Sequence, residues 1–390
     1  MTGGSPDPGT ATLRRGRDRG RRAIRRAVSG VIMGTIVFFA LTPTGCYLSR
    51  AGWEEAKILG RRRPIATLVA DSALDAGTRA KLRLVLEARD YARYSLGLDV
   101  GESFTTFSPL ERDTLVLLVS AAHRDRLVAY TWWFPIVGRV PYKGFFDFGA
   151  ARALAGRLQR EGFDVYLRPA SAFSTLGWFN DPLLSTTLES DSLDLVNTVI
   201  HEVTHNSYYG AGQAEFNESF ANFVGARGAE AFFRARGETA SAEQTVRRWE
   251  DEKRLATFWS ALYRSLDSAF AAHPESREAR LLARDTVYAR ARRALVDDVG
   301  PRLRTVARHY GERVVLDNAA LMARRVYLTD IELFDSALAR DGGNLPRTIR
   351  RVVDLAKGAK SDPFSAVRRW VDTVPPADSL RLPRPPHAMH

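Results

Sequence analysis

Hydrophobic residues recur with two different spacings in the first half of the chain, which predicts a mixture of helices and strands. Apolar positions three or four residues apart predict helices, and short runs rich in β-branched and aromatic residues predict strands. The expected helices cover residues 53–59, 72–96 and 148–161, and the expected strands cover residues 114–120, 129–137 and 165–167. The part from 46 to 190 is therefore expected to be mixed α and β.

Helical spacing dominates the second half of the chain. From Asp191 to Val371 amphipathic segments follow one another, with one clear break at the Gly-Gly-Asn-Leu-Pro run of 342–346. The last residues, 372–390, are rich in proline and are expected to be loose. The two halves together predict an α+β fold in which a β-containing part precedes a mainly helical part.

The first 45 residues have the pattern of an export signal. A basic stretch ends at Arg26, and an apolar run over 28–41 follows it. This run is shorter than the stretch of about 20 residues that a membrane-spanning helix needs. Small residues then lead to Cys46 in a Thr-Gly-Cys ending that resembles a bacterial lipoprotein box, although Pro43 stands where leucine is usual. Either Cys46 is lipidated or the segment is an uncleaved signal anchor, and both alternatives place the body on the extracytoplasmic side of a membrane in the cell envelope.

Composition and charge narrow the classes of function. Hydrophobic residues make up 45% of the chain and charged residues 26%, as in a folded soluble body. The net charge of +12 suggests nucleic acid at first, but residues 1–45 carry eight arginines and two aspartates and so supply half of it. The later arginines are scattered among acidic residues, without a basic stripe that includes aromatics. Nucleic-acid binding is therefore not expected, and a single cysteine excludes an intramolecular disulfide.

The helix expected over 193–209 contains the sequence His-Glu-Val-Thr-His. Because His201 and His205 are four residues apart, they lie one turn apart on one face and can bind a single zinc ion. Glu202 is rotated from His201 by about 100° around the helix axis, so it can reach a water that the metal activates. These three residues predict two metal ligands and a general base.

A catalytic zinc needs a third protein ligand and an open fourth position. Glu218 lies thirteen residues after His205, near the start of the next expected helix. The glycine-containing link over 210–213 is long and flexible enough to fold that helix back onto the first. Glu218 is therefore the expected third ligand, and Glu215 is its rival, since it lies three residues earlier and can also face inward.

This pair of helices resembles those of the thermolysin-like and other gluzincin peptidases. In those enzymes a second helix carries Asn-Glu and, four positions on, an acidic residue that supports a ligand histidine. Here Asn217 precedes Glu218, and Asn222 stands at the acidic position. Its amide oxygen can accept a hydrogen bond from His201, although a neutral amide polarises the imidazole less than a carboxylate does. The resemblance implies a zincin-like fold, in which a β-containing part leads into a helical part through the motif helix.

A second resemblance extends over most of the chain, from Cys46 to Trp370. Its segments are VGRVPYKGFF over 137–146, STLGWFNDPLLST over 174–186, FNESFA over 216–221 and NAAL over 318–321. Joined to the His-Glu motif, they are similar to a bacterial family of predicted lipoproteins that is described as putative aminopeptidases. The resemblance implies a zinc peptidase and, by the family's name, an aminopeptidase.

Candidate residues for peptide binding lie on both sides of the motif helix. In zinc peptidases the stretch just before that helix commonly supplies an edge along which the substrate backbone aligns. We therefore expect Gly177–Pro182 to border the cleft, with Trp178 or Phe179 shaping a side-chain pocket; the alternative is a buried loop that packs its aromatic residues. An aminopeptidase also needs an anion for the substrate's free α-amino group, and Glu215 and Asp181 are the candidates.

Four residues could stabilise the oxyanion of the transition state beside the metal. They are Tyr142, Tyr208, Tyr209 and His309, of which Tyr208 is also a candidate for substrate binding. Tyr208 and Tyr209 fit equally as core or rim aromatics, and His309 as an ordinary helix-surface histidine. The sequence does not rank them.

Three functions of different classes follow from these patterns. The first is a zinc peptidase that uses metal-activated water, with a peptide as its substrate. The second is a zinc amidase or endopeptidase that acts on cell-envelope peptides. The third is a catalytically silent lipoprotein that binds partners. The third is disfavoured because a binding module has no use for a general base at Glu202.

Overall fold

The computed structural model describes residues 42–110, 114, 116–134, 138–170, 182–359 and 361–373. The chain divides into two compact units, Met1–Gly60 and Arg61–His390. The helix α2 (Pro43–Gly60) makes up nearly all of the described part of the first unit and contains the exposed Cys46. Within the described ranges, no helix combines the length and apolar character needed to cross a membrane. Most of the expected export signal, residues 1–41, and the tail from 374 lie outside these ranges.

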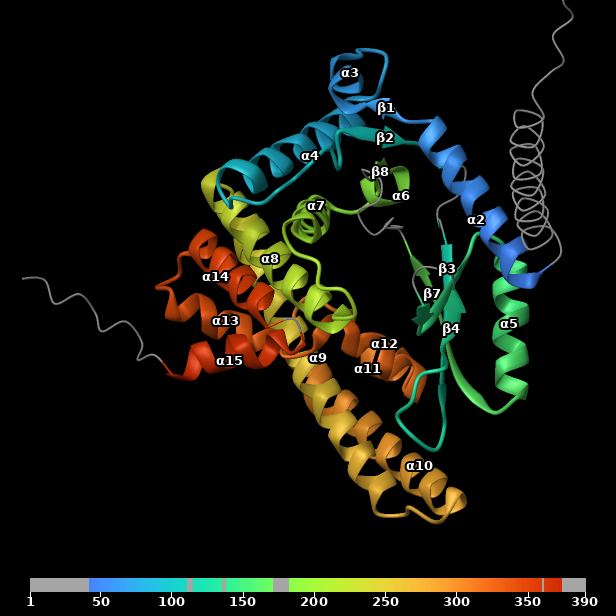
Figure 1. The fold of residues 1–390 in the computed structure, drawn as a ribbon. Coiled ribbons are helices and arrows are strands. Elements are labelled where there is room, and N and C mark those ends of the chain that lie inside the picture. The colour runs from blue at the N-terminus through green and yellow to red at the C-terminus, as the bar shows by residue number, and fades with distance from the viewer. Residues whose placement is uncertain are drawn as a thin grey trace, which may run out of the picture. The chain divides into compact units, whose positions relative to one another are not determined.

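The second unit contains a three-stranded antiparallel sheet with β3 (Val116–His123) at its centre (Figure 1). β3 pairs with β6 (Tyr142–Phe145) along one edge and with β7 (Phe163–Ala170) along the other. Alternate side chains of β3, among them Val119 and Ala121, pack on the helix α5 (Phe148–Arg160). The other face of β3 and β7 contacts α12 (Asn318–Leu328), so each face of the sheet is covered by a helix.

Among the residues that the structure describes, five further strands form two smaller sheets. One has the order β1-β2-β8 and the other pairs β4 with β5. The strands are β1 (Arg63–Pro64), β2 (Thr106–Ser108), β8 (Leu183–Leu184), β4 (Trp132–Phe134) and β5 (Gly138–Val140). The first part of this unit also contains the helices α3 (Ile65–Ala70), α4 (Ala76–Tyr94) and α6 (Ser185–Leu188). The mixture of helices and strands expected in the first half is therefore confirmed.

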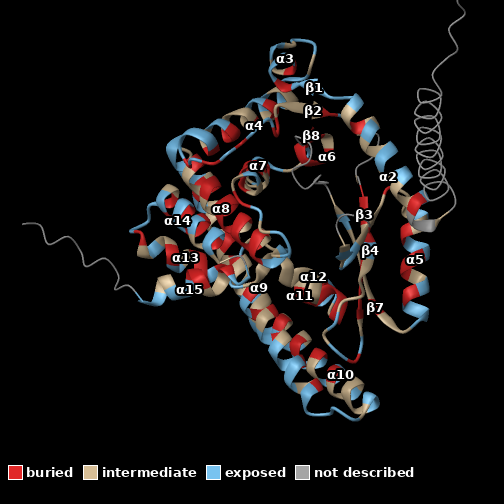
Figure 2. Cartoon of the chain, viewed as in Figure 1, coloured by how far each residue is buried: buried red, intermediate tan, exposed pale blue. Residues whose placement is uncertain are grey.

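The helical core is built around α8 (Ala214–Ala235), most of which is buried (Figure 2). Phe216, Phe220 and Phe223 of this helix contact Phe334 of α13 (Ile331–Arg340). α8 also packs on α7 (Ser192–Ser207) and α9 (Thr239–Ala271). The remaining helical elements in the described part of this half are α10 (Arg277–Ala294), η1 (Leu295–Val299), η2 (Gly300–Arg302), α11 (Tyr310–Arg313), α14 (Leu345–Gly358) and α15 (Pro363–Thr373). The mainly helical second half is thus confirmed.

The break expected at 342–346 separates α13 from α14. Gly342 and Gly343 have φ angles of +64° and +78°, in the left-handed region that glycine adopts without steric cost. Asn344 then begins α14, because its side chain accepts a hydrogen bond from the backbone N–H of Arg347.

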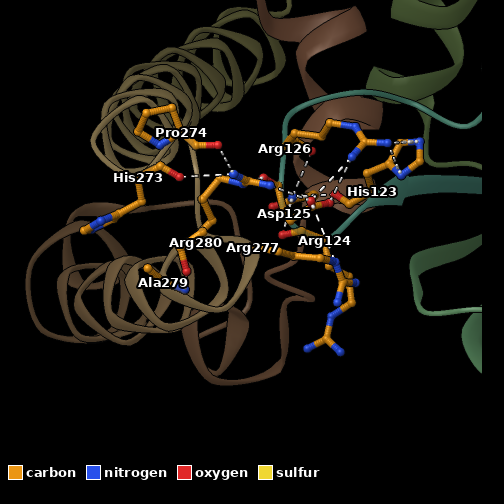
Figure 3. Close-up of polar contacts among 11 residues, drawn as sticks. His123, Arg124, Asp125, Arg126, His273, Pro274, Arg277, Ala279 and Arg280 are labelled. Carbon is orange, nitrogen blue, oxygen red and sulfur yellow. Dashed lines mark hydrogen bonds and ion pairs between the residues drawn. The ribbon is translucent and has the colours of Figure 1, made fainter.

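A buried aspartate ties the turn between α9 and α10 to the end of β3 (Figure 3). Arg280 of α10 donates to both the carbonyl and the carboxylate of Asp125, and its Nη1 donates to the carbonyls of His273 and Pro274. Burial by itself raises the pKa of Asp125, but the hydrogen bond from Arg280 and the charges of neighbouring arginines outweigh it and lower the pKa. Asp125 is therefore ionised at neutral pH and anchors the α9–α10 pair to the sheet.

Candidate metal centre

The helix α7 carries both histidines of the motif on one face. Asp191 caps its first turn by accepting hydrogen bonds from two backbone N–H groups. Arg248 of α9 pairs with Asp191 at 2.6 Å and also with Asp194, so it holds the start of α7 against its neighbour. One turn apart near the other end of the helix, the rings of His201 and His205 have their centroids 5.1 Å from each other.

Glu218 reaches these histidines from α8. Its carboxylate oxygens lie 3.4 Å from Nε2 of His201 and 3.7 Å from Nε2 of His205. The turn between α7 and α8 is held by Asn217, whose buried side chain accepts a hydrogen bond from the N–H of Gly210 and donates one to its carbonyl, both at 2.9 Å. Because Asn217 directly precedes Glu218, these two hydrogen bonds also fix the start of α8 relative to the histidines.

Two glycines let α8 approach α7 closely at the candidate metal centre. A Cβ atom on Gly225 would lie 3.0 Å from the carbonyl oxygen of Asn197 and 3.1 Å from Cβ of His201. A Cβ atom on Gly228 would lie 2.9 Å from the side chain of Ile200. Gly225 follows Glu218 by about two helical turns, so the close contact is on the face that carries the ligand.

We expect Gly225→Ala to destabilise the protein and to weaken zinc binding. The added methyl group meets backbone and Cβ atoms that cannot rotate away, and overpacking of this kind costs about 1–3 kcal/mol. Thermal unfolding measures the first effect, and competition with a chelator measures the second. The control is Gly156→Ala in α5, where the nearest atom is the flexible end of Arg160 at 3.5 Å. Equal stability changes in the two variants would contradict the role of close packing.

The three side chains fit a zinc ion by their chemistry and their spacing. One ligand atom from each of His201, His205 and Glu218 lies within 4.8 Å of the other two. Two atoms that bind one tetrahedral zinc at about 2.0–2.1 Å lie about 3.3–3.4 Å apart. The observed separations of 3.4 and 3.7 Å between Glu218 and the two histidines are close to that value. Two imidazoles and one carboxylate are also a donor set used by catalytic zinc sites.

The charges at this centre set the protonation state of each ligand. Burial lowers the pKa of His205 to about 4, helped by the charge of His201, so this imidazole is neutral at pH 7. Burial also acts to lower the pKa of His201, but its hydrogen bond with Glu218 and the charge of Glu202 outweigh it and raise the pKa. Burial acts to raise the pKa of Glu218, and the two histidines more than offset it, so the carboxylate is ionised. A metal ion at this centre would therefore compete with a proton on His201.

Asn222 supports His201 from one turn further along α8. Its Nδ2 donates a hydrogen bond to the carbonyl of Tyr327 at 2.8 Å, which orients the amide. Its interaction with His201 is a side-chain hydrogen bond that raises the pKa of the imidazole, as expected when the amide oxygen accepts from the ring. Among the described residues, Nδ1 of His205 has no hydrogen-bond partner, so the two histidines are held differently.

Polar groups from the sheet and from α12 also surround Glu218. The charge of Arg168 on β7 contributes to lowering the pKa of Glu218. Tyr142 on β6 keeps part of its ring exposed. Burial by the surrounding protein nevertheless raises the pKa of Tyr142 to about 12, and the nearby Tyr327 acts in the same direction. Burial, Glu218 and Glu202 raise the pKa of Tyr327 on α12. The arginine and both tyrosines therefore belong to the electrostatic surroundings of Glu218, and Tyr327 also contacts Asn222 directly.

Comparison with known proteins agrees with this arrangement of motifs. A family model described as "Putative aminopeptidase" matches residues 46–366. The chain belongs to this family. No curated protein and no solved structure matches the chain. The family's name indicates a peptidase, and the match covers the motif helix, the helix α8 and the sheet of this family member.

The other candidate site residues of this family member lie in different surroundings. Glu215 lies 3.8 Å from the guanidinium of Arg325 and accepts a hydrogen bond from Thr329 at 3.4 Å. Tyr208 is buried in the core, where its ring contacts Phe216 with centroids 5.7 Å apart, as the core alternative predicts. The substrate residues Trp178 and Asp181, like most of the 174–186 segment, lie outside the described ranges.

The two other oxyanion candidates occupy different environments. Tyr209 is half exposed, and its ring meets His205 edge to face with centroids 6.2 Å apart. His309 lies on the exposed surface and interacts with Glu312 at 3.1 Å. The structure therefore brings Tyr142 and Tyr209 near the ligands and leaves Tyr208 in the core.

Sequence reasoning missed Arg168, Tyr327 and Gly225. A signal for the first exists, because Asp164, Tyr166 and Arg168 alternate with apolar residues along a strand and so share one face. A small residue at 225 and another at 228 inside a helix also indicate close helix packing. The sequence offers no comparable signal for Tyr327, which reaches the site through the packing of α12 on the sheet.

Proposed function

We propose that the chain is a zinc-dependent peptidase that removes residues from the free N-termini of peptides. One observation carries this proposal: His201, His205 and Glu218 converge from two helices, with Glu202 beside them on α7. Membership of a family described as putative aminopeptidases supports the class of substrate. The order of a β-containing part, a motif helix and a second ligand helix supports a zincin-like arrangement.

Each residue at this centre has a separate role in the proposed reaction. His201, His205 and Glu218 would hold the zinc ion, and Asn222 would orient His201. When bound, zinc polarises the scissile carbonyl and lowers the pKa of a water ligand towards about 7. Glu202 accepts the proton of the attacking water and later delivers it to the leaving amine. Tyr142 or Tyr209 would then donate a hydrogen bond to the oxyanion, since both phenols are protonated at neutral pH.

The location of the protein is part of the same proposal. We infer that the N-terminal segment holds the chain at the outer face of a membrane, either through a lipid on Cys46 or as a signal anchor. Within residues 1–45 a basic stretch is followed by an apolar run, as in an export signal. This order and the exposed position of Cys46 on α2 support the inference. Peptides of the cell envelope would then be within reach of the site.

Cleavage of two matched peptide libraries tests the proposed activity. One library has free N-termini and the other is N-acetylated, and both are incubated with the purified full-length chain while its bound metal is counted. We expect about one zinc per chain and release of N-terminal residues from the free library only. Internal cleavage of both libraries would replace the aminopeptidase with an endopeptidase. A chain that binds zinc but cuts neither library would point to another amide of the envelope, and one that binds no metal would overturn the proposal.

A further inference from the structure

One face of β7 presents three polar side chains towards α12. Along β7, Phe163, Val165 and Leu167 pack on the α5 side of the sheet, so the intervening side chains point to the opposite face. These are Asp164, Tyr166 and Arg168, and they lie progressively nearer to the end of the strand. The face is therefore shared by structural contacts at one end and by the metal centre at the other.

Two of the three side chains have structural partners. Asp164 accepts hydrogen bonds from Arg284 at 2.5 Å and from the backbone N–H of Asn318 at 3.0 Å, which joins β7 to α10 and α12. Tyr166 lies beside the guanidinium of Arg324, at 5.9 Å from its ring centroid. Both contacts hold helices against the sheet, so Asp164 and Tyr166 have structural roles.

Arg168 differs because no carboxylate of the described residues lies within ion-pair distance of its guanidinium. Among the described residues, the guanidinium of Arg168 makes one hydrogen bond and one cation–π contact, both with Tyr327. An N–H of Arg168 donates to the hydroxyl at 3.4 Å, and the guanidinium lies 5.5 Å from the ring centroid. By contrast, Arg284 is paired with Asp164, and Arg325 lies 3.8 Å from Glu215. A partly buried guanidinium that is not paired with a carboxylate is unfavourable, unless a ligand supplies the partner.

The neighbouring anion, Glu218, is already engaged by other groups. Its two oxygens face the Nε2 atoms of His201 and His205, at 3.4 and 3.7 Å. Arg168 is linked to this centre through Tyr327, whose hydroxyl accepts a hydrogen bond from Arg168 and whose carbonyl accepts one from Asn222 on α8. Its charge also acts on Glu218, although the two are not within ion-pair distance. The guanidinium therefore stands next to the metal ligands with N–H groups left for a further acceptor, while Tyr327 restricts its position.

We propose that Arg168 binds a carboxylate of the peptide substrate beside the metal centre. Guanidinium groups bind carboxylates through two parallel N–H···O hydrogen bonds, which fix both the position and the orientation of the ligand. The inference rests on the proposed peptidase function and narrows its substrates to peptides that carry a carboxylate near the cleaved bond. Two sources supply this group: the C-terminus of a short peptide and an acidic side chain.

Four tripeptides distinguish these sources. Leu-Ala-Ala is compared with its C-terminal amide, and the amide of Leu-Glu-Ala with that of Leu-Gln-Ala. Steady-state kcat and KM are measured for the zinc-loaded full-length chain, for Arg168→Gln and for Arg168→Lys. Arg160→Gln, an exposed arginine on α5, serves as the matched control. Thermal unfolding and metal content show whether each variant is folded and loaded.

The expected result is a preference for a carboxylate of about tenfold or more in kcat/KM, carried mainly by KM, in one of the two pairs. Arg168→Gln should abolish the preference by raising KM for the carboxylate-bearing peptide to about that of its uncharged counterpart, whereas Arg168→Lys should retain part of the preference because the charge remains. Arg160→Gln should retain it fully. The pair that responds identifies the source of the carboxylate.

Two outcomes would overturn the inference. One is a wild-type chain that does not discriminate within either pair. The other is a fall in kcat that is equal for all four peptides in Arg168→Gln, which would assign Arg168 to the reacting carbonyl. If no peptide is cleaved at all, the proposed function fails, and the inference is then judged by calorimetry. At least one of Leu-Ala-Ala and Leu-Glu-Ala amide should then bind the zinc-loaded wild-type chain about tenfold or more tightly than it binds zinc-loaded Arg168→Gln. Equal binding of both peptides to the two chains would overturn the inference.

Discussion

Glu202→Gln should bind zinc as the wild-type chain does and lose about 10²- to 10⁴-fold in kcat, the usual contribution of a general base. Glu202 follows His201 on α7, and its charge contributes to raising the pKa of both His201 and Tyr327. Glutamine has nearly the same shape but cannot accept a proton from water. The loss should therefore appear in kcat with little change in KM.

Paired measurements separate this catalytic loss from a structural one. Bound zinc and the midpoint of thermal unfolding are determined for Glu202→Gln, and the same is done for Glu243→Gln on α9, where the exposed carboxylate pairs with Arg247 at 3.6 Å. The control variant should match the wild-type chain in all properties. If Glu202→Gln instead lost its zinc, Glu202 would be a ligand; if it kept full turnover, another group would be the base.

Local periodicity explains which parts of the site could be predicted from the sequence. His201, Glu202 and His205 lie on a single helix, so their relative directions follow from 3.6 residues per turn. Glu218 lies on the next helix after a short turn, and the structure places its carboxylate 3.4 Å from His201. The elements of the fold were predictable for the same reason, since α5, α7 and β7 each show one clear spacing.

The groups that surround the ligands depend on tertiary packing instead. Tyr327 lies more than one hundred residues from Glu218 in the sequence, and it reaches the centre because α12 packs between α8 and the sheet. Arg168 comes from the sheet itself, whose register is set by pairing with β3. Tyr208 shows the opposite case: a polar aromatic next to the motif was a candidate for function, but its ring fills the core against Phe216. Spacing along the chain does not contain this information.

Glu218→Gln should weaken zinc binding by at least about 100-fold, whereas Glu215→Gln should leave it unchanged. Loss of a side chain that hydrogen-bonds to a metal ligand already costs about 10- to 100-fold in metal affinity, and loss of a ligand itself should cost more. The structure separates the two carboxylates, because Glu218 faces both histidines while Glu215 lies 3.8 Å from Arg325. Both residues lie in the first two turns of α8, so the variants are matched in helix position.

Competition with a chelator of known affinity measures the effect, and thermal unfolding of the metal-free proteins provides the control. Without metal, Glu218→Gln also removes the ion pair with His201, so a modest loss of stability is expected alongside the loss of affinity. Activity should follow zinc occupancy in Glu218→Gln and should return in part when zinc is raised to saturation. If Glu215→Gln lost the metal and Glu218→Gln kept it, the third ligand would be Glu215, and α8 would have to rotate from its position in this structure to bring Glu215 to the histidines.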